Sequence, residues 1–194
     1  MGDCLVTVPP VYTASVFGYC SNARDGIARR ERHPWRGCES GALPDRFCYL
    51  GWGKGDLWGE RVGPHVWRDQ VPLKRLLRAG LVVGAGSDWG PKNPWEQMQL
   101  AETHEFAASG HRNATPDHAV TRDEAIVMWT RDAGRVLGWD GVGTLAPGSH
   151  ADVIVVDRDP LTRRLDELPA TSVLLTLLGG RVVHDGGKLD TRGA

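Results

Sequence analysis

The sequence has no long apolar run, and no stretch of it approaches the roughly 18 residues of a membrane-spanning helix. The N-terminal residues Met1–Val6 also lack the basic segment that precedes the apolar core of a signal peptide. Lys and Arg total 23 and Asp and Glu total 24, and the formal net charge of −1 offers no excess of positive charge to nucleic acid or to an acidic membrane surface. We therefore expect a cytoplasmic protein without a nucleic-acid or membrane partner.

Paired cysteine motifs are also missing. The four cysteines all lie in the first quarter of the chain, at Cys4, Cys20, Cys38 and Cys48. None belongs to a Cys-x-x-Cys pair, and no histidine spacing completes a zinc finger. This spacing favours reduced thiols in a cytoplasmic protein, and a disulfide framework is the alternative.

The chain is short for one common enzyme fold. Its 194 residues are fewer than the about 250 residues of a complete (β/α)8 barrel. The composition is 41% hydrophobic and 24% charged, which is ordinary for a globular protein. The length allows one domain, or one domain with a small appendage.

The first third of the chain has little regular pattern. The run Leu5–Val8, stopped by Pro9 and Pro10, predicts a short buried strand. Residues 21–66 show no clear apolar periodicity and carry scattered Gly, Arg and Trp. A stretch of that length without structure is unusual in a compact domain. We expect a functional loop, or a loop with a short helix that the pattern does not locate.

The middle of the chain predicts helices around one strand. The pattern indicates a helix over 72–80 that begins at a proline, and then an apolar strand over 81–86. An apolar run flanked by helices is typical of a buried parallel strand. Asn93, as an N-cap ahead of Pro94, predicts another helix that extends to about Ser109.

The final part predicts one more helix and then a small sheet. Thr121 and Glu124 form a capping-box pattern, and the helix that follows is expected to end at Gly138. A strand is predicted over 152–157, and residues 172–184 read as a hairpin with a two-residue glycine turn. This order of elements indicates an α/β protein with a small β unit at its C-terminal end.

Asp88 is the strongest candidate for chemistry because it comes directly after the apolar strand 81–86. Reactive groups gather at the carboxyl ends of parallel strands in α/β proteins. A carboxylate at that position can bind a divalent metal and accept a proton from the metal's water. The alternative is a turn or N-cap aspartate, which the Ser-Asp sequence ahead of a proline also suits.

Several segments together resemble a known enzyme family. They are, in order, Gly-Ala-Gly-Ser-Asp-Trp at 84–89, Asn-Pro-Trp at 93–95, Thr-Arg-Asp-Glu-Ala-Ile at 121–126, the run 143–157, and Gly-Gly-Arg-Val-Val at 179–183. Their order and spacing resemble the amidohydrolase 3 family of metal-dependent amidohydrolases, from about residue 71 to residue 186.

The resemblance implies a fold and a site. The fold would be the C-terminal portion of a (β/α)8 barrel, with about strands seven and eight over residues 1–140, and then a β-sandwich segment over 141–194. In the family, the aspartate that matches Asp88 ends the last barrel strand and binds the metal or activates the water. Trp89 and Asn93 beside it are candidates to contact substrate, and packing for Trp89 and helix capping for Asn93 are the alternatives.

The remaining ligands of the family are missing from the sequence. It contains no His-x-His pair, which the family places on its first barrel strand, and its earliest strand, Leu5–Val8, would match strand seven. Its histidines are not spaced as ligand pairs, and we expect them to be surface residues. Zinc catalysis needs about three protein ligands around an open position. The resemblance thus implies a divalent metal, zinc, whose other ligands this chain lacks.

The function implied by the resemblance is hydrolysis of a non-peptide carbon–nitrogen bond by metal-activated water. The substrate would be a small-molecule amide or N-acyl compound. A missing N-terminal half, or further copies in a homo-oligomer, would then be the protein partner. The alternative from another class is a non-catalytic, truncated remnant or binding module of an amidohydrolase.

Overall fold

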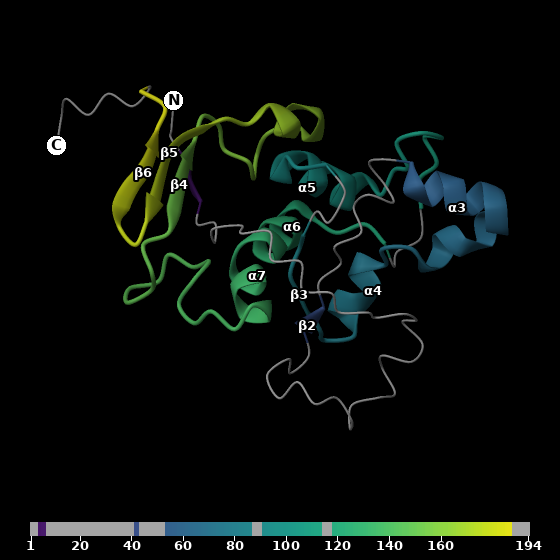
Figure 1. Cartoon of the computed structure of the whole chain (residues 1–194), viewed down its shortest axis with the longest axis horizontal. Helices are drawn as coiled ribbons and strands as arrows, with labels where there is room; N and C mark the ends of the chain where they lie inside the picture. Colours follow the sequence, from purple (N-terminus) through teal and green to yellow (C-terminus); the bar gives the residue numbers. More distant parts are fainter. Residues whose placement is uncertain (1–3, 7–40, 43–52, 87–90, 114–117, 188–194) are drawn as a thin grey trace.

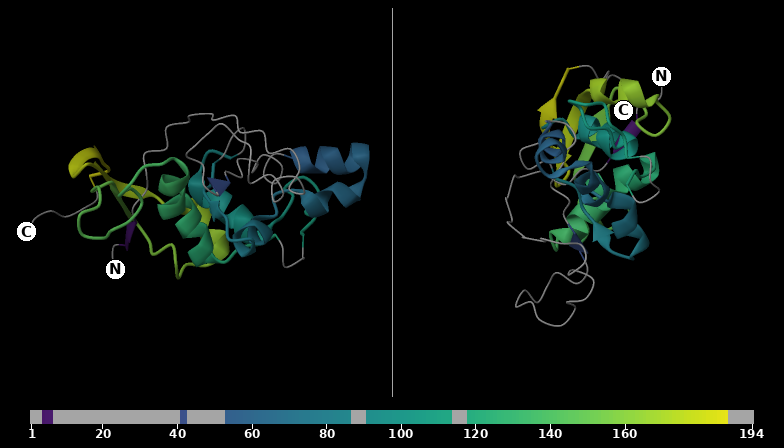
Figure 2. Two further views of the ribbon diagram at one scale, coloured as in Figure 1. Left: turned by 90° about the horizontal axis from the view of Figure 1, so that it is seen from below. Right: turned by 90° about the vertical axis from the view of Figure 1, so that its right-hand side faces the viewer.

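The computed structural model describes residues 4–6, 41–42, 53–86, 91–113 and 118–187, which form two β-sheets and a group of helices (Figure 1). One sheet has four strands in the order β1-β4-β5-β6, and the other has the two strands β2 and β3. The helices lie between the four-stranded sheet at one end and α3 at the other end (Figures 1 and 2). No helix among these residues is long and apolar enough to cross a membrane.

The four-stranded sheet is antiparallel throughout. Its strands are β1 (Cys4–Val6), β4 (Val153–Val156), β5 (Val173–Leu178) and β6 (Arg181–Asp185). The turn between β5 and β6 consists of two glycines with φ of 56° and 77°. Such positive φ angles are those that a two-residue hairpin turn requires, and glycine adopts them without strain. The predicted strand and hairpin of the C-terminal part are confirmed.

The position of β1 differs from the one expected from the sequence. The run Leu5–Val8 was expected to lie in the barrel as its seventh strand, and that expectation is wrong. The strand forms over Cys4–Val6 and pairs antiparallel with β4, with Leu5 opposite Val155. The physical reason is that a short β-branched run favours a strand without specifying which sheet edge it joins.

The partner of β3 comes from the stretch expected as a loop. Strand β2 (Gly41–Ala42) pairs in parallel with β3 (Val82–Val83). The same stretch also contains α3 (Lys54–Val62), and the 3-10 helix η1 (Pro64–Asp69) begins within it. The helix that residues 21–66 were expected to contain is α3, and a functional role for this stretch stays a prediction.

The sequence shows no apolar periodicity over α3, because the inward face of this helix consists of glycine and aspartate. Gly55, Asp56 and Gly59 are its buried residues. A Cβ atom placed on Gly59 would lie 2.4 Å from ring carbons of Trp67, and one on Gly55 would lie 2.2 Å from Phe106 Cε1. The aromatic rings fill the space that side chains of α3 would otherwise occupy.

The remaining helices surround β3. They are α4 (Leu73–Arg78), α5 (Pro94–Thr103), α6 (Arg122–Trp129) and α7 (Arg131–Val136), with the 3-10 helix η2 (Leu165–Ala170) against α5. The capping box that begins α6 is confirmed. The single helix expected up to Gly138 is instead two helices, because Thr130 at φ −119° and ψ −98° interrupts it. Helix α5 ends earlier than expected, at Thr103.

A single core joins these helices to the four-stranded sheet. Val83 of β3, Met98 of α5 and Met128 of α6 are buried in it. Val156 of β4 and Leu168 of η2 belong to the same cluster and have no exposed surface. The C-terminal sheet therefore packs directly on the helices around β3.

We expect Gly59→Ala to destabilise the protein by about 1–3 kcal/mol, because its Cβ would overlap the Trp67 ring. The about 1 kcal/mol that alanine gains over glycine in a helix does not offset this overlap. Urea denaturation would measure the change, with the exposed Glu60→Ala on the same helix as control. Equal or greater stability of Gly59→Ala would contradict the packing described for α3.

Candidate functional site

The structure describes residues on either side of Asp88 in the sequence. Asp88 and Trp89 themselves lie outside the described residues. On the N-terminal side, the backbone amide of Ala85 donates to the carbonyl of Met128 at 3.1 Å. On the C-terminal side, the carbonyl of Pro91 accepts a hydrogen bond from Gln97 Nε2 at 2.5 Å. Ala85 and Pro91, which stand three residues before and after Asp88 in the sequence, are thus hydrogen-bonded to α6 and to α5, respectively.

Asn93, the third candidate residue, has structural partners for both ends of its carboxamide. Its Oδ1 accepts from the backbone amide of Trp95 at 3.0 Å, which makes Asn93 the N-cap of α5. Its Nδ2 donates to the carbonyl of Pro169 at 2.9 Å. The capping alternative is confirmed, and the side chain also connects the start of α5 to η2. A contact between Asn93 and substrate stays a prediction.

Two histidines are buried, which corrects the expectation that the histidines lie on the surface. His104 and His118 have no exposed surface, and their ring centroids are 4.6 Å apart. His104 Nε2 lies 2.9 Å from the carbonyl of Val71, and His118 Nε2 lies 2.9 Å from the carbonyl of Arg68. The His104 ring therefore attaches the segment after η1 to the end of α5, and the His118 ring attaches η1 itself to the residues before α6.

The surroundings of His104 favour its neutral form. Burial is the main cause that lowers its pKa to about 4, and the charges of His118 and His111 lower it further. The hydrogen bond to Val71 opposes this shift. We assign the proton to Nε2, because that atom faces a carbonyl oxygen, whereas Nδ1 lies 3.3 Å from the amide donor Asn113 Nδ2.

The sequence alone did not identify this cluster. His104 follows the last residue of α5 with φ of 49°, in the left-handed conformation that ends helices. No local pattern indicates that its ring meets His118, 14 residues further along the chain. Trp67 of η1 stacks on the ring of His111, and their ring centroids are 4.2 Å apart.

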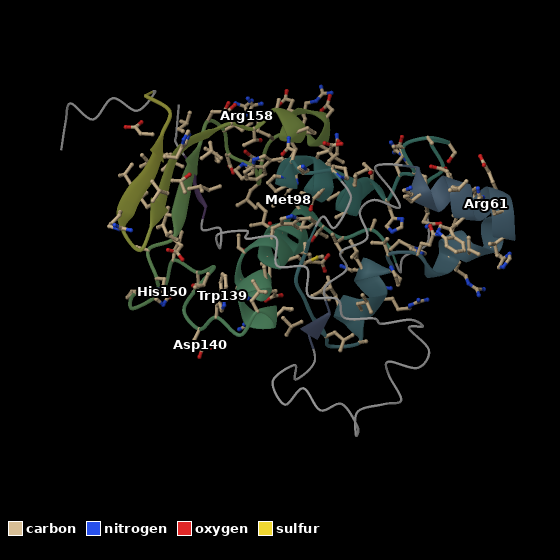
Figure 3. The ribbon with its side chains drawn as sticks, viewed as in Figure 1. Arg61, Met98, Trp139, Asp140, His150 and Arg158 are labelled. Atoms are coloured by element: carbon tan, nitrogen blue, oxygen red, sulfur yellow. The ribbon has the colours of Figure 1, made fainter. Side chains whose placement is uncertain are left out.

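The described side chains do not fit a metal centre. Over the residues that the structure describes, no group of three or more His, Cys, Asp and Glu side chains could hold a metal ion. The two buried histidines do not form one, because a ring nitrogen of each faces a backbone carbonyl. Figure 3 shows Asp140 and His150, with Trp139, on the loops between α7 and β4, whereas Met98 lies among the central helices.

Comparison with known proteins gives a family match. Residues 43–184 match the model of a family described as "Amidohydrolase family". The chain is 33% identical over 133 residues to an N-substituted formamide deformylase from Arthrobacter pascens, covering 63% of this chain and 24% of that protein. It is 32% identical over 128 residues to a 5-methylthioadenosine/S-adenosylhomocysteine deaminase from Symbiobacterium thermophilum, covering 60% of this chain and 29% of that protein.

A solved structure shows the same fold. It is an uncharacterised metal-dependent hydrolase from Pyrococcus horikoshii, with a TM-score of 0.50 and 24% sequence identity. The likeness covers 66% of this chain and 26% of that one. The chain thus spans about a quarter of the length of the proteins that it matches.

The lowered pKa of His104 predicts that acid destabilises the fold. Between pH 6.5, the ordinary histidine value, and about pH 4, the unfolded chain binds a proton that folded His104 does not. The free energy of unfolding is therefore highest above pH 6.5 and falls with pH across this window, by on the order of 3 kcal/mol. Urea denaturation between pH 7 and pH 4.5 would measure the decrease.

A histidine substitution separates this effect from other titrations. His104→Asn removes the titrating ring and keeps a residue that tolerates a left-handed backbone. We expect it to lower stability at pH 7 and to flatten the dependence of stability on pH. A variant as acid-sensitive as the original protein would show that His104 is not the cause.

Proposed function

The chain belongs to the amidohydrolase family, and from that membership we propose that it forms part of a hydrolase acting on non-peptide carbon–nitrogen bonds. The observation that carries the proposal is the family match over residues 43–184, which includes β3, Asp88 and the C-terminal strands. The related deformylase and deaminase are both named for reactions of small molecules. A small-molecule amide or N-acyl compound is accordingly the substrate class that we propose.

Asp88 is the residue to which we assign the proton transfers. It lies five residues beyond the end of β3, which pairs in parallel with β2. The carboxyl ends of such strands are where α/β proteins place reacting groups. The carboxylate of Asp88 would accept a proton from the attacking water and return it to the leaving nitrogen. Trp89 and Asn93 follow it in the chain and are proposed to contact substrate.

A divalent metal, zinc, is part of this proposal. When bound, the ion would polarise water and the carbonyl group of the substrate. The proposed ligand in this chain is Asp88, and the described side chains do not supply a set of further ligands. The remaining ligands would come from an N-terminal part of the enzyme or from another copy in a homo-oligomer, in a cytoplasmic protein.

The proposal also divides the chain into a barrel part and a C-terminal part. We propose that β2 and β3 are the last two strands of a (β/α)8 barrel, and that β4, β5 and β6 belong to a small β-sandwich. The boundary would lie near residue 140. Strand β1 would belong to the C-terminal unit, because it pairs with β4.

The test supplies the rest of the barrel and then removes the carboxylate. The chain would be joined to, or co-expressed with, the N-terminal segment of a family member that carries the other metal ligands. With added zinc and a panel of N-acyl amino acids, cyclic amides and N-substituted formamides, we expect hydrolysis, and we expect Asp88→Asn to lower kcat by about 10²–10⁴-fold. Asparagine keeps the size of aspartate but cannot accept the proton.

Thermal unfolding of both proteins provides the control. A catalytic aspartate predicts little change in Tm, since asparagine favours the same turns and caps. Equal rates for the two proteins would remove Asp88 from the mechanism. A completed barrel without turnover on any substrate would favour the alternative, a non-catalytic binding module.

A further inference from the structure

Helix α3 and the 3-10 helix η1 form an arm that is attached to the loop after α5. We call residues 53–70 the α3–η1 arm, and it lies at the end of the molecule away from the four-stranded sheet (Figures 1 and 2). The amide of Ala108 donates to Asp56 Oδ2 at 3.3 Å. Asn113 Nδ2 donates to the carbonyl of Trp67 at 2.9 Å. Both partners of the arm belong to the loop between α5 and α6.

Two buried histidine rings complete this attachment. His104 Nε2 donates to the carbonyl of Val71, the residue that follows the arm, at 2.9 Å. His118 Nε2 lies 2.9 Å from the carbonyl of Arg68 in η1. The two rings meet edge to face, with centroids 4.6 Å apart, and have no exposed surface. The arm is therefore held at its C-terminal end by two rings that can take up protons.

Val71 joins the arm to α4 in a backbone conformation that valine rarely adopts. Its φ is 46°, in the left-handed region, where a β-branched residue is an outlier. Pro72 follows it, and a residue before proline favours extended rather than helical angles. The amide of Leu73 donates to the Val71 carbonyl at 2.8 Å, which closes a tight turn over Pro72. Strained positions of this kind persist only where surrounding contacts hold them, and they are typical of switch regions.

The contact that holds Val71 comes from another left-handed residue. Among the described residues, Val71 and His104 are the ones that combine a side chain with a positive φ. The hydrogen bond between the His104 ring and the Val71 carbonyl joins them. Without this bond, Val71 would relax toward the extended conformation that the following proline favours, and the arm would turn away from the loop after α5.

A charged His104 ring does not fit this arrangement. Charging adds a proton to Nδ1, which lies 3.3 Å from the amide donor Asn113 Nδ2. The carboxamide of Asn113 is held in its orientation, because its Nδ2 donates to the Trp67 carbonyl and its Oδ1 lies 3.3 Å from His111 Nε2. Two donors would then oppose each other in a buried place, which destabilises the closed arm.

The charged groups around His104 do not compensate a proton on its ring. Burial is the main cause that lowers its pKa to about 4, and the charges of His118 and His111 lower it further. Arg68 of η1 is exposed. The other charged side chains on the neighbouring segments pair with each other, Glu105 with Arg112 and Lys74 with Glu124.

We propose that the α3–η1 arm is a hinged unit, with Val71 as its hinge and the buried rings of His104 and His118 as the latch that keeps it closed. Protonation of the latch frees Val71 from its left-handed conformation and opens the arm. The opening leaves the core helices and the four-stranded sheet in place, so it precedes unfolding of the whole chain as the pH falls.

Hydrogen exchange on the full chain tests the latch. Between pH 6.5 and about pH 4, the open arm binds a proton that the closed arm does not. We therefore expect the protection of amides in residues 53–70, relative to the intrinsic rate at each pH, to fall on the order of 50-fold between pH 7 and pH 4.5.

Urea separates opening of the arm from unfolding of the whole chain. Low urea should change the protection of the arm little, because opening exposes less surface than unfolding does. Amides of β4 and β5 should be more protected at each pH and should lose protection as urea rises. Equal protection and equal urea dependence of arm and sheet would overturn the proposal, and so would an arm whose protection does not fall with pH.

His104→Asn tests whether this ring is the latch. Asparagine tolerates the left-handed backbone but neither titrates nor carries the ring donor. We expect the arm to open more often at pH 7, and the change in its protection between pH 7 and pH 4.5 to shrink to less than about tenfold. An arm with the pH dependence of the original protein would refute the role of His104.

Val71→Gly and Val71→Ala test the hinge, and they keep the proposal open to refutation if the histidine variant does not fold. Both remove the buried valine side chain, and glycine also removes the strain of a positive φ. We expect the arm of Val71→Gly to be at least about threefold more protected at pH 7 than that of Val71→Ala, the reverse of the usual order of these residues. Equal or lower protection in Val71→Gly would show that Val71 stores no strain and would overturn the hinge.

Discussion

The burial of helix α5 is the constraint on which the rest of the structure depends. Its apolar side, with Met98 and Leu100, lies in the common core, and its polar side chains connect it to each neighbouring segment. Asn93 and Gln99 donate to carbonyls of η2, and Gln97 donates to the carbonyl of Pro91. Because all three side chains belong to α5 or its N-cap, this helix connects η2 to Pro91.

Local signals in the sequence predict the elements that local interactions determine. The capping box at Thr121 and Glu124, the Asn93–Pro94 helix start and the glycine hairpin are specified by residues next to one another. The partner of β1 and the helix α3 were not predictable in this way. A short apolar strand does not identify its neighbour, and α3 is packed by rings from outside its own sequence.

The residues of the candidate site likewise divide into those that a local sequence pattern identifies and those that it does not. Asp88 could be selected from the sequence because an apolar strand precedes it, and the capping role of Asn93 because a proline follows it. Gln97 and the buried His104 could not be selected. A glutamine within a helix has no local signature, and its partner, the carbonyl of Pro91, is known only from the structure. The buried histidines likewise depend on contacts with η1 and the chain after it.

Helix α3 also reverses the usual pattern of mutational tolerance. Its glycines face inward, whereas Leu57, Trp58 and Val62 are 38%, 50% and 49% exposed. In most amphipathic helices, the polar outer face varies most freely, whereas the inner face keeps large apolar residues. Here the glycines of the inner face accept no added atoms, while the apolar outer residues, about half exposed, tolerate replacement better. Sequence variants of this protein should therefore keep small residues at the inner positions and diverge at the bulky ones.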